Sequence, residues 1–398
     1  MAKGFFSPSK IKQENPNDLR GPKCGICGLY QTCHSPKMPP TGRGRKKVLI
    51  VAEAPGKQED RQGVQLIGDA GQRLRKNLKQ IGIDLDRDCW KTNAVICRPP
   101  HNNTPDSEKI VACRPNLWET VETLQPKVVL LLGGVALRCA VGKLWKEGVG
   151  NLSRWVGDQI PGHRLNAWLC PTWHPSFLIR TDDKVLDLLF RQHLKRAFKK
   201  VDKPLPKPID LKRSVRTEFN THTAARLIRR MRQEGVPLAF DYETNCLKPE
   251  FPGARILCCS ISNGRTSVAF PWHGEAIGEM QTTLSSGIPM IAANTKFEER
   301  WGKIHAQTPV KNWLCCTMIG AHVLDNREGR TSLKFQAFVT MGVGSYDDHV
   351  GPFMEAGKNG LNKLDQLDLK DLLFYNGADS LLTWKLAMIQ RRKMGYEV

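Results

Sequence analysis

The stretch TNAVICRPPHNNTPDSEKIVAC, Thr92–Cys113, decides how the first half of this chain folds. It starts at the end of an apolar run typical of a buried strand and continues into a rigid Cys-Arg-Pro-Pro turn. Two of its residues, Cys97 and Cys113, are cysteines sixteen positions apart. A second pair, Cys24-Gly-Ile-Cys27, stands nearer the N-terminus. We therefore expect the fold to bring these four cysteines together.

Short apolar runs alternate with helical stretches around this segment. Such alternation predicts a doubly wound α/β layer, in which helices cover a parallel sheet. Ligands of these sheets bind outside the carboxyl ends of the strands, and Glu53, Asn93 and His174 all fall close to such ends. The sequence therefore predicts a binding site there. The expected strands are Lys47–Ala52, Trp90–Ile96, Lys127–Leu132 and Ala167–Cys170, and a helix with a basic face is expected over Ala70–Ile81.

A basic segment with three prolines, Val201–Val215, separates the two halves of the chain. Its composition predicts a semi-rigid linker. We therefore expect one domain over residues 1–200, the linker over 201–215 and a second domain over 216–398. The elements expected in the second domain are a basic helix Thr221–Gln233, strands Val236–Phe240, Arg255–Ile261, Thr266–Phe270 and Pro289–Ala293, a turn at Asn263-Gly264, and a helix Asp371–Arg392.

The net charge of +21, from 60 Lys and Arg against 39 Asp and Glu, favours a polyanionic partner. Nucleic acid is that partner in our interpretation, and a merely soluble basic protein is the alternative. The N-terminal residues 1–18 have no apolar core of a signal peptide, and the run Val128–Leu137 is too short to span a bilayer. We expect no membrane partner and a cytoplasmic protein, nucleoid-associated or in the host cytoplasm if it is viral.

Thirteen cysteines without an export signal indicate reduced thiols and metal ligation rather than disulfides. The quartet Cys24, Cys27, Cys97 and Cys113 offers four soft ligands, which suit either structural zinc or an iron–sulfur cluster. Spacing alone leaves both open. Cys33 is a fifth candidate without an assigned role, and the cysteines expected to be ordinary buried residues are Cys89, Cys139, Cys170, Cys258 and Cys315.

The order of motifs over residues 20–200 resembles the family 4 uracil-DNA glycosylases. The motifs that carry the resemblance are the CxxC pair, Ala52-Glu-Ala-Pro-Gly56, Glu59-Asp60, Gly68-Asp-Ala-Gly71, Thr92-Asn93, Cys97-Arg-Pro-Pro100, Cys113 and His174-Pro-Ser176. The resemblance implies a [4Fe–4S] cluster on the four cysteines. It also implies a uracil pocket that includes Gly56, Leu66 and Asn93, in which Asn93 reads the base edge and Glu53 and His174 serve the cleavage.

These residue types suit the removal of a base. A glycosylase flips a nucleotide out and stabilises an oxocarbenium-like sugar beside a departing uracil anion. An amide reads uracil, a carboxylate positions water or opposes the sugar's charge, and an imidazole hydrogen-bonds the developing anion. The chain departs from the family at two positions: Ala52 stands where the family has Gly, and Leu66 stands where a Phe is expected to stack on the base. The second departure predicts weaker or altered base selection.

A second set of polar residues occurs beyond the linker. Asp241-Tyr-Glu243 at a strand end places two carboxylates on one face, because side chains alternate along a strand. Glu298 offers a third carboxylate, and Asp379 a fourth on a helix that also presents Tyr375 four residues earlier. Four carboxylates around one point repel one another unless cations intervene. The set therefore predicts two Mg²⁺ or Mn²⁺ ions that bridge a scissile phosphate.

Residues 207–398 resemble the proofreading 3′–5′ exonuclease domain of family A DNA polymerases, which has a DnaQ-like, RNase H-like α/β fold. Asp241 and Glu243 match the first motif, and Tyr375 with Asp379 the third. Cys316–Asp325 and the following Ser332-Leu-Lys resemble the segment between the second and third motifs. Glu298 stands where Asp is the commoner second-motif residue. Since the chain stops where a polymerase would continue, the resemblance implies a separately encoded family A polymerase as a possible partner.

The sequence thus predicts a bifunctional DNA enzyme, a uracil-DNA glycosylase fused to a metal-dependent 3′–5′ exonuclease that acts on uracil-containing DNA and on 3′ ends. Two alternatives remain. In the first, the glycosylase half is catalytically silent and delivers DNA to the exonuclease. In the second, the nuclease half acts mainly on RNA.

Overall fold

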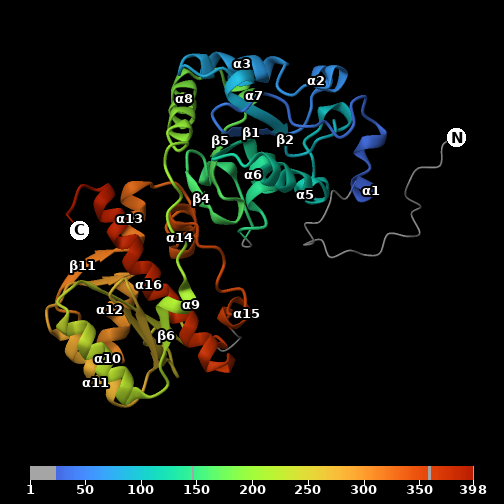
Figure 1. Ribbon diagram of the computed structural model, residues 1–398. Coiled ribbons are helices and arrows are strands. Elements are labelled where there is room, and N and C mark those ends of the chain that lie inside the picture. The colour runs from blue at the N-terminus through green and yellow to red at the C-terminus, as the bar shows by residue number, and fades with distance from the viewer. Residues whose placement is uncertain (1–23, 146–147, 357–359, 398) are drawn as a thin grey trace. The chain divides into compact units, whose positions relative to one another are not determined.

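The computed structural model describes residues 24–145, 148–356 and 360–397. The chain consists of two compact units, Met1–Lys207 and Pro208–Val398 (Figure 1). The division lies inside the segment for which the sequence predicts a linker. Residues 1–18, on which the expectation of no signal peptide rests, lie outside the described part. Among the described helices, none is both long and apolar enough to cross a membrane.

The first unit is built on a five-stranded sheet in the order β2-β1-β3-β5-β4. The first four strands in this order are parallel, and β4 runs antiparallel to β5 at one edge. The predicted parallel α/β layer is therefore confirmed. The strands are β1 (Val48–Ala52), β2 (Cys89–Asn93), β3 (Val128–Leu132), β4 (Ile160–Gly162) and β5 (Ala167–Thr172).

Helices cover both faces of this sheet. Leu74 of α3 and Phe190 of α8 pack on the face that carries Val48 and Ile50, and α6 contacts β1 and β3. Because β1 and β3 are buried on both faces, their sequences are continuous apolar runs. The helices are α1 (Cys24–Cys27), α2 (Lys57–Gln62), α3 (Asp69–Lys79), α4 (Leu85–Asp88), α5 (Ser107–Leu124), α6 (Gly133–Val141), α7 (Pro175–Thr181) and α8 (Lys184–Phe198), with short 3-10 turns η2 (Leu29–Gln31), η3 (Pro100–Asn102), η4 (Leu152–Arg154) and η5 (His163–Leu165).

The second strand is shorter than the predicted Trp90–Ile96, since β2 ends at Asn93. The next residues leave the sheet but stay buried, because Ala94 donates its backbone N–H to Ala52 and Val95 donates to Glu53. This turn directs the chain away from the strand end and toward Cys97. The short edge strand β4 is not foreseen in the sequence, because its three residues include a proline and a glycine.

The second unit is built on a six-stranded mixed sheet in the order β11-β10-β7-β8-β9-β6. β8 is antiparallel to both β7 and β9, whereas β7, β10 and β11 are parallel. The predicted α/β layer of the second domain is confirmed. The strands are β6 (Val215–Thr217), β7 (Leu238–Thr244), β8 (Ile256–Ser262), β9 (Ser267–Pro271), β10 (Met290–Ala292) and β11 (Trp313–Cys316).

The two faces of this sheet pack against different helices. Phe240 and Tyr242 lie in a core with residues of α10 and α11, whereas Ala239 packs with residues of α16. By alternation, Asp241 and Glu243 lie on the face that α16 covers. The helices are α9 (Leu211–Ser214), α10 (Thr221–Gln233), α11 (Glu275–Ser285), α12 (Thr295–Ile304), α13 (Thr317–Leu324), α14 (Leu333–Met341), α15 (Gly351–Met354) and α16 (Leu369–Lys393), with a 3-10 turn η6 (Leu364–Gln366).

The end of the predicted linker is ordered structure. Leu211–Ser214 forms α9, and Val215 begins β6, which pairs in parallel with β9. Three residues are too few for a period of two to show in the sequence, so this strand is found only through its pairing. β11 is not predicted from the sequence for a related reason. Its four residues are half-buried and belong to a stretch that the sequence predicts to be helical.

Candidate functional sites

The polar residues that follow the strands of the first unit line one pocket of about 700 Å³. Glu53 follows β1, Asn93 ends β2, and His174 lies between β5 and α7. Gly56 and Leu66 line the same pocket. The fold therefore gathers these five residues at the carboxyl edge of the sheet, where α/β proteins bind ligands.

Asn93 is the pocket's candidate for reading a base. Its side chain is 3 % exposed, and its amide nitrogen Nδ2 has no hydrogen-bond partner among the described residues. A buried amide without a partner costs free energy, so such a group in a native pocket is a candidate for binding a ligand. The Asn93 amide can both donate and accept, which suits the edge of a pyrimidine.

His174 is held as a neutral imidazole. Burial, and after it the charge of the nearby Arg180 guanidinium, lower its pKa to about 4. As the N-cap of α7, His174 accepts a hydrogen bond through Nδ1 from the backbone N–H of Ser176. The proton of the neutral ring is therefore on Nε2, which can donate to an oxygen atom. Gly133 makes room for this residue, since a Cβ there would lie 3.1 Å from the His174 Cβ.

Glu53 has a carboxyl group that burial shifts toward the neutral form. Its pKa is raised by burial, and a hydrogen bond from Thr104 and the charges of Arg138 and Arg180 oppose that rise. Thr104 and Arg180 also line the pocket, although sequence reasoning did not single them out. Arg180 stands four residues after Ser176 on α7 and donates to its hydroxyl at 3.3 Å, and that hydroxyl lies 2.7 Å from Nδ1 of His174. This spacing of four from the His-Pro-Ser motif is the signal that could have identified it.

Leu66 occupies the wall where the family resemblance places a stacking aromatic ring. Its side chain is buried in the core of the first unit, and its backbone is left-handed with φ of 56°. Gly71 of α3 approaches it closely, since a Cβ on Gly71 would lie 2.0 Å from the Leu66 carbonyl oxygen. Trp173 and Phe177 contribute the aromatic rings that the pocket does contain.

The four predicted cysteine ligands line one small cavity. Cys24 and Cys27 come from α1, Cys113 from α5, and Cys97 from the turn after β2. Three of the sulfur atoms accept backbone hydrogen bonds, Cys97 from Lys37 at 3.2 Å, Cys113 from Ile96 at 3.5 Å and Cys27 from Leu29. N–H groups directed at sulfur favour the thiolate form that a metal requires.

Without a cation, these thiols are disfavoured as thiolates. Burial raises the pKa of Cys97 to about 12, raises that of Cys27 and holds that of Cys113 well above the ordinary value. Cys33 lies beside Cys97 but does not line the cavity. Of the five cysteines expected to be ordinary, Cys315 is half-buried and the other four are buried, Cys89, Cys139, Cys170 and Cys258.

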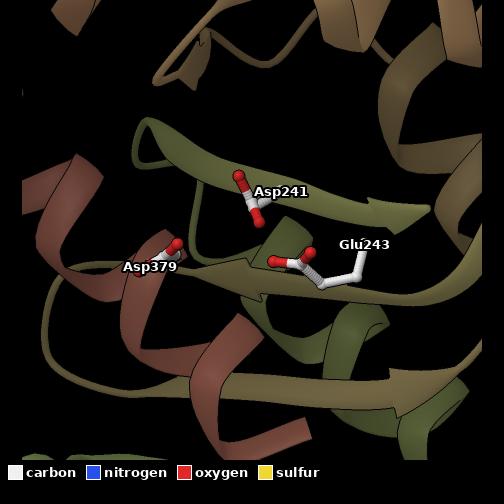
Figure 2. A group of neighbouring side chains, drawn as sticks. All are labelled: Asp241, Glu243 and Asp379. Atoms are coloured by element: carbon white, nitrogen blue, oxygen red, sulfur yellow. The ribbon is translucent and has the colours of Figure 1, made fainter. Parts of the chain in front are cut away.

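In the second unit, Asp241 and Glu243 of β7 and Asp379 of α16 form a tight acidic group. One carboxylate oxygen from each lies within 4.8 Å of the other two. Figure 2 shows the three carboxyl groups gathered between the strand and the helix. All three pKa values are raised, first by burial and also by charged neighbours, and that of Asp379 reaches about 6. Such a group suits hard divalent cations, which prefer carboxylate oxygen ligands.

Glu298 lies beside this group but outside it. Its side chain is 2 % exposed and accepts a hydrogen bond at 3.2 Å from the backbone N–H of Tyr242. The charges of Asp241 and Glu243 still raise its pKa, after burial. The structure therefore brings together three of the four predicted metal ligands and holds the fourth nearby by another contact.

Tyr375, the remaining predicted residue, hydrogen-bonds Asp379 from one turn earlier on α16. It is buried, and burial keeps the pKa of its phenol well above the ordinary value. Asn376 donates to the Asp241 carboxylate at 2.9 Å. Sequence reasoning missed Asn376, although it is adjacent to Tyr375.

Comparison with known proteins places the first unit in a known group. Residues 39–202 match the model of the uracil DNA glycosylase superfamily. A type-4 uracil-DNA glycosylase of Pyrobaculum aerophilum is 33% identical over 165 residues, which cover 39% of this chain and 80% of that protein. A type-4 enzyme of Thermotoga maritima is 32% identical over 180 residues, which cover 44% of this chain and 88% of that protein.

Two further similarities are more limited. A DNA polymerase of Bacillus phage SP01 is 32% identical over 102 residues, which cover 25% of this chain and 11% of that protein. Among solved structures, Brucella melitensis NrnC with bound Mg²⁺ has a TM-score of 0.34 and 17% identity, and the match covers 46% of this chain and 82% of that one.

Proposed function

Because this chain belongs, through its first unit, to the family of type-4 uracil-DNA glycosylases, we propose that this unit excises uracil from DNA. We further propose that the second unit removes nucleotides from 3′ ends with divalent metal ions. The observation that carries the first proposal is the buried Asn93 amide, whose Nδ2 atom lacks a partner among the described residues and which shares a pocket with Glu53 and His174. The net charge of +21 supports a nucleic acid substrate.

In the proposed glycosylase, each residue has a distinct role. The Asn93 amide recognises the edge of the flipped uracil, because it pairs a donor with an acceptor. His174 donates from Nε2 to the uracil oxygen on which negative charge develops as the bond to the sugar breaks. The Glu53 carboxylate opposes the positive charge on the sugar or positions the attacking water. Arg180 places a cation near the departing anion.

The cysteine cavity supports an iron–sulfur cluster better than zinc. In the described part of the chain, no three of the four sulfur atoms come within 4.8 Å of one another. A tetrahedral zinc ion with bonds of about 2.3 Å would hold its sulfurs about 3.8 Å apart. We therefore propose that Cys24, Cys27, Cys97 and Cys113 hold a [4Fe–4S] cluster. Bound there, the cluster would join α1, α5 and the turn after Asn93 in one rigid arrangement.

For the exonuclease, the acidic group of Asp241, Glu243 and Asp379 carries the proposal. The raised pKa values of these carboxyl groups reflect burial and mutual repulsion, which divalent cations relieve. Bound by these residues, two Mg²⁺ or Mn²⁺ ions would supply an activated hydroxide and stabilise the leaving oxygen. Tyr375 then orients the reacting groups next to Asp379, and Glu298 adds negative charge behind Asp241.

A separately encoded family A DNA polymerase is the partner that we propose for this enzyme. The partial similarity to a phage DNA polymerase supports it. In this proposal one unit screens DNA for uracil while the other trims mismatched 3′ ends. Copurification from the native host would test the association, and recovery of the protein without any polymerase would count against it.

The activity test uses end-labelled oligonucleotides, namely DNA with one uracil, the same DNA with thymine, and a matched RNA. In EDTA, the uracil strand should acquire an alkali-labile site and the thymine strand should not, since glycosylase chemistry needs no added divalent ion. With Mg²⁺, DNA should shorten stepwise from its 3′ end. If RNA is shortened faster than DNA, the substrate that we propose for the nuclease becomes RNA. Absence of any abasic product in EDTA would favour the accessory function, in which the first unit only delivers DNA.

A further inference from the structure

Two adjacent residues of the second unit, Tyr346 and Asp347, reach the neighbourhood of the acidic group from an irregular segment between α14 and α15. The Tyr346 hydroxyl donates a hydrogen bond to Oδ1 of Asp379. Asp347 forms an ion pair with Lys334 of α14, with 2.6 Å between Oδ2 and Nζ. The Lys334 ammonium in turn lies 5.0 Å from the centre of the Tyr375 ring. Neither Tyr346 nor Asp347 was singled out in the sequence.

The surroundings of Tyr346 hold it in place as a donor. Its ring lies 6.2 Å from that of Tyr375 and packs against the core that contains Leu372 and Leu373. The hydroxyl donates to a carboxylate that lies among two other acidic groups, and so it fixes the orientation of that carboxylate.

We propose that Tyr346 and Asp347 are positioning residues of the exonuclease site, one fixing the Asp379 carboxylate for the metal ions and the other fixing the Tyr375 ring through Lys334. The inference rests on the proposed exonuclease function and deepens it. Asp379 is repelled by Asp241 and Glu243, and the hydrogen bond from Tyr346 to Oδ1, together with that from Tyr375, keeps its carboxylate in the group. Outer partners of metal ligands commonly act in this way, and their loss weakens metal binding by about 10- to 100-fold.

The first experiment measures Mn²⁺ binding to the full-length protein by titration calorimetry, without DNA. Tyr346→Phe removes only the hydroxyl, and it should weaken Mn²⁺ binding by about tenfold or more. Tyr242→Phe is the matched control. It also removes a buried tyrosine hydroxyl, and Tyr242 stands between Asp241 and Glu243 in the sequence, but its hydroxyl has no hydrogen-bond partner among the described residues. It should leave Mn²⁺ binding unchanged. Thermal unfolding of each variant checks that it is folded.

The second experiment tests whether Asp347 positions the Tyr375 ring through Lys334. Asp347→Asn should lower kcat for 3′ shortening by about tenfold and weaken Mn²⁺ binding less than Tyr346→Phe does. If Asp347 acts through Tyr375, adding Asp347→Asn to the Tyr375→Phe variant should lower kcat little further, because the effects of two coupled substitutions do not add. Lys303→Gln, which breaks the ion pair of the exposed Lys303 with the half-buried Glu299 in the same unit, is the control and should retain kcat.

The outcomes separate this inference from the proposed function. If the wild type binds Mn²⁺ but shortens no nucleic acid, the exonuclease proposal fails, and the calorimetry of Tyr346→Phe still decides the role of Tyr346. Wild-type Mn²⁺ affinity in Tyr346→Phe would overturn that role. Full additivity of Asp347→Asn with Tyr375→Phe would overturn the role of Asp347. A wild type that binds no Mn²⁺ would overturn the inference and the metal site together.

Discussion

The backbone N–H of Ile96 donates to Sγ of Cys113 at 3.5 Å, and Ile96 stands three residues after Asn93. The segment that presents a side-chain amide to the pocket is thus the one that supports a cysteine ligand. Arg98, next to Cys97, adds a contact of 3.8 Å to Asp60 of α2 and a hydrogen bond of 2.7 Å to Asn102, which lines the pocket. The cysteine cavity and the base pocket therefore share their supporting backbone.

Replacement of one of the four proposed cluster ligands should remove the proposed cluster and damage the base pocket. Cys113→Ser should abolish the brown absorption near about 400 nm and bound iron, and it should lower the thermal midpoint. Cys139→Ser is the matched control, because Cys139 is buried nearby and contacts the Ala94 carbonyl at 3.6 Å but does not line the cavity. Visible spectroscopy and iron analysis of both variants show whether only Cys113→Ser loses the absorption and the iron. Equal loss of colour in both variants would contradict the assigned ligand set.

The pH dependence of uracil release should have one acid limb, due to Glu53. Burial raises the pKa of Glu53, and its carboxylate is the active form, so activity should fall as the pH drops through that raised pKa. His174, with a pKa of about 4, stays neutral from pH 5.5 to 8 and should add no limb there. Rates in EDTA measured over this range and down to the ordinary pKa of a Glu carboxyl, about 4.3, test both statements. In Glu53→Gln, the residual activity should lose the acid limb, and a limb that persists would assign it elsewhere.

A ring at position 66 should improve uracil binding. Leu66→Phe should lower KM for uracil-containing DNA several-fold, since stacking of a base on an aromatic ring contributes about 1–3 kcal/mol. The larger side chain should also lower stability by about 1–3 kcal/mol, because Leu66 is buried in the core. Leu74→Phe makes the same change in that core outside the pocket, so it should lose stability without the gain in KM. Unchanged or weaker uracil binding by Leu66→Phe would show that Leu66 does not weaken uracil binding.

The acidic group should destabilise the protein when no metal is present. Its carboxyl groups bind protons more tightly when folded, so in EDTA their contribution to stability should fall as the pH rises from about 4 through the raised pKa values. Glu243→Gln removes one of the repelling charges. It should raise the thermal midpoint in EDTA at pH 7 by a few degrees and abolish stabilisation by Mn²⁺. Thermal scans with and without Mn²⁺ measure this, and a lower midpoint for Glu243→Gln in EDTA would contradict it.

Much of the pocket of the first unit could be predicted from the sequence, because several of the residues that line it lie at strand ends. Glu53, Asn93 and His174 lie at the end of a strand or within two residues of one, and parallel strands place these ends at one edge. The left-handed backbone of Leu66 could not be predicted, because it depends on the close approach of Gly71 from α3. The role of Tyr346 could not be predicted from the sequence for a similar reason. It lies in an irregular segment without periodicity, and its role exists only through its contact with α16.

The most direct test of the central claim, that one chain holds two independent active sites, compares Asn93→Ala and Asp241→Ala on the same uracil-containing DNA. Asn93→Ala should release uracil about 100-fold or more slowly in EDTA and shorten 3′ ends with Mg²⁺ at the wild-type rate. Asp241→Ala should show the reverse. Loss of both activities in either variant, or of neither in both, would contradict the claim.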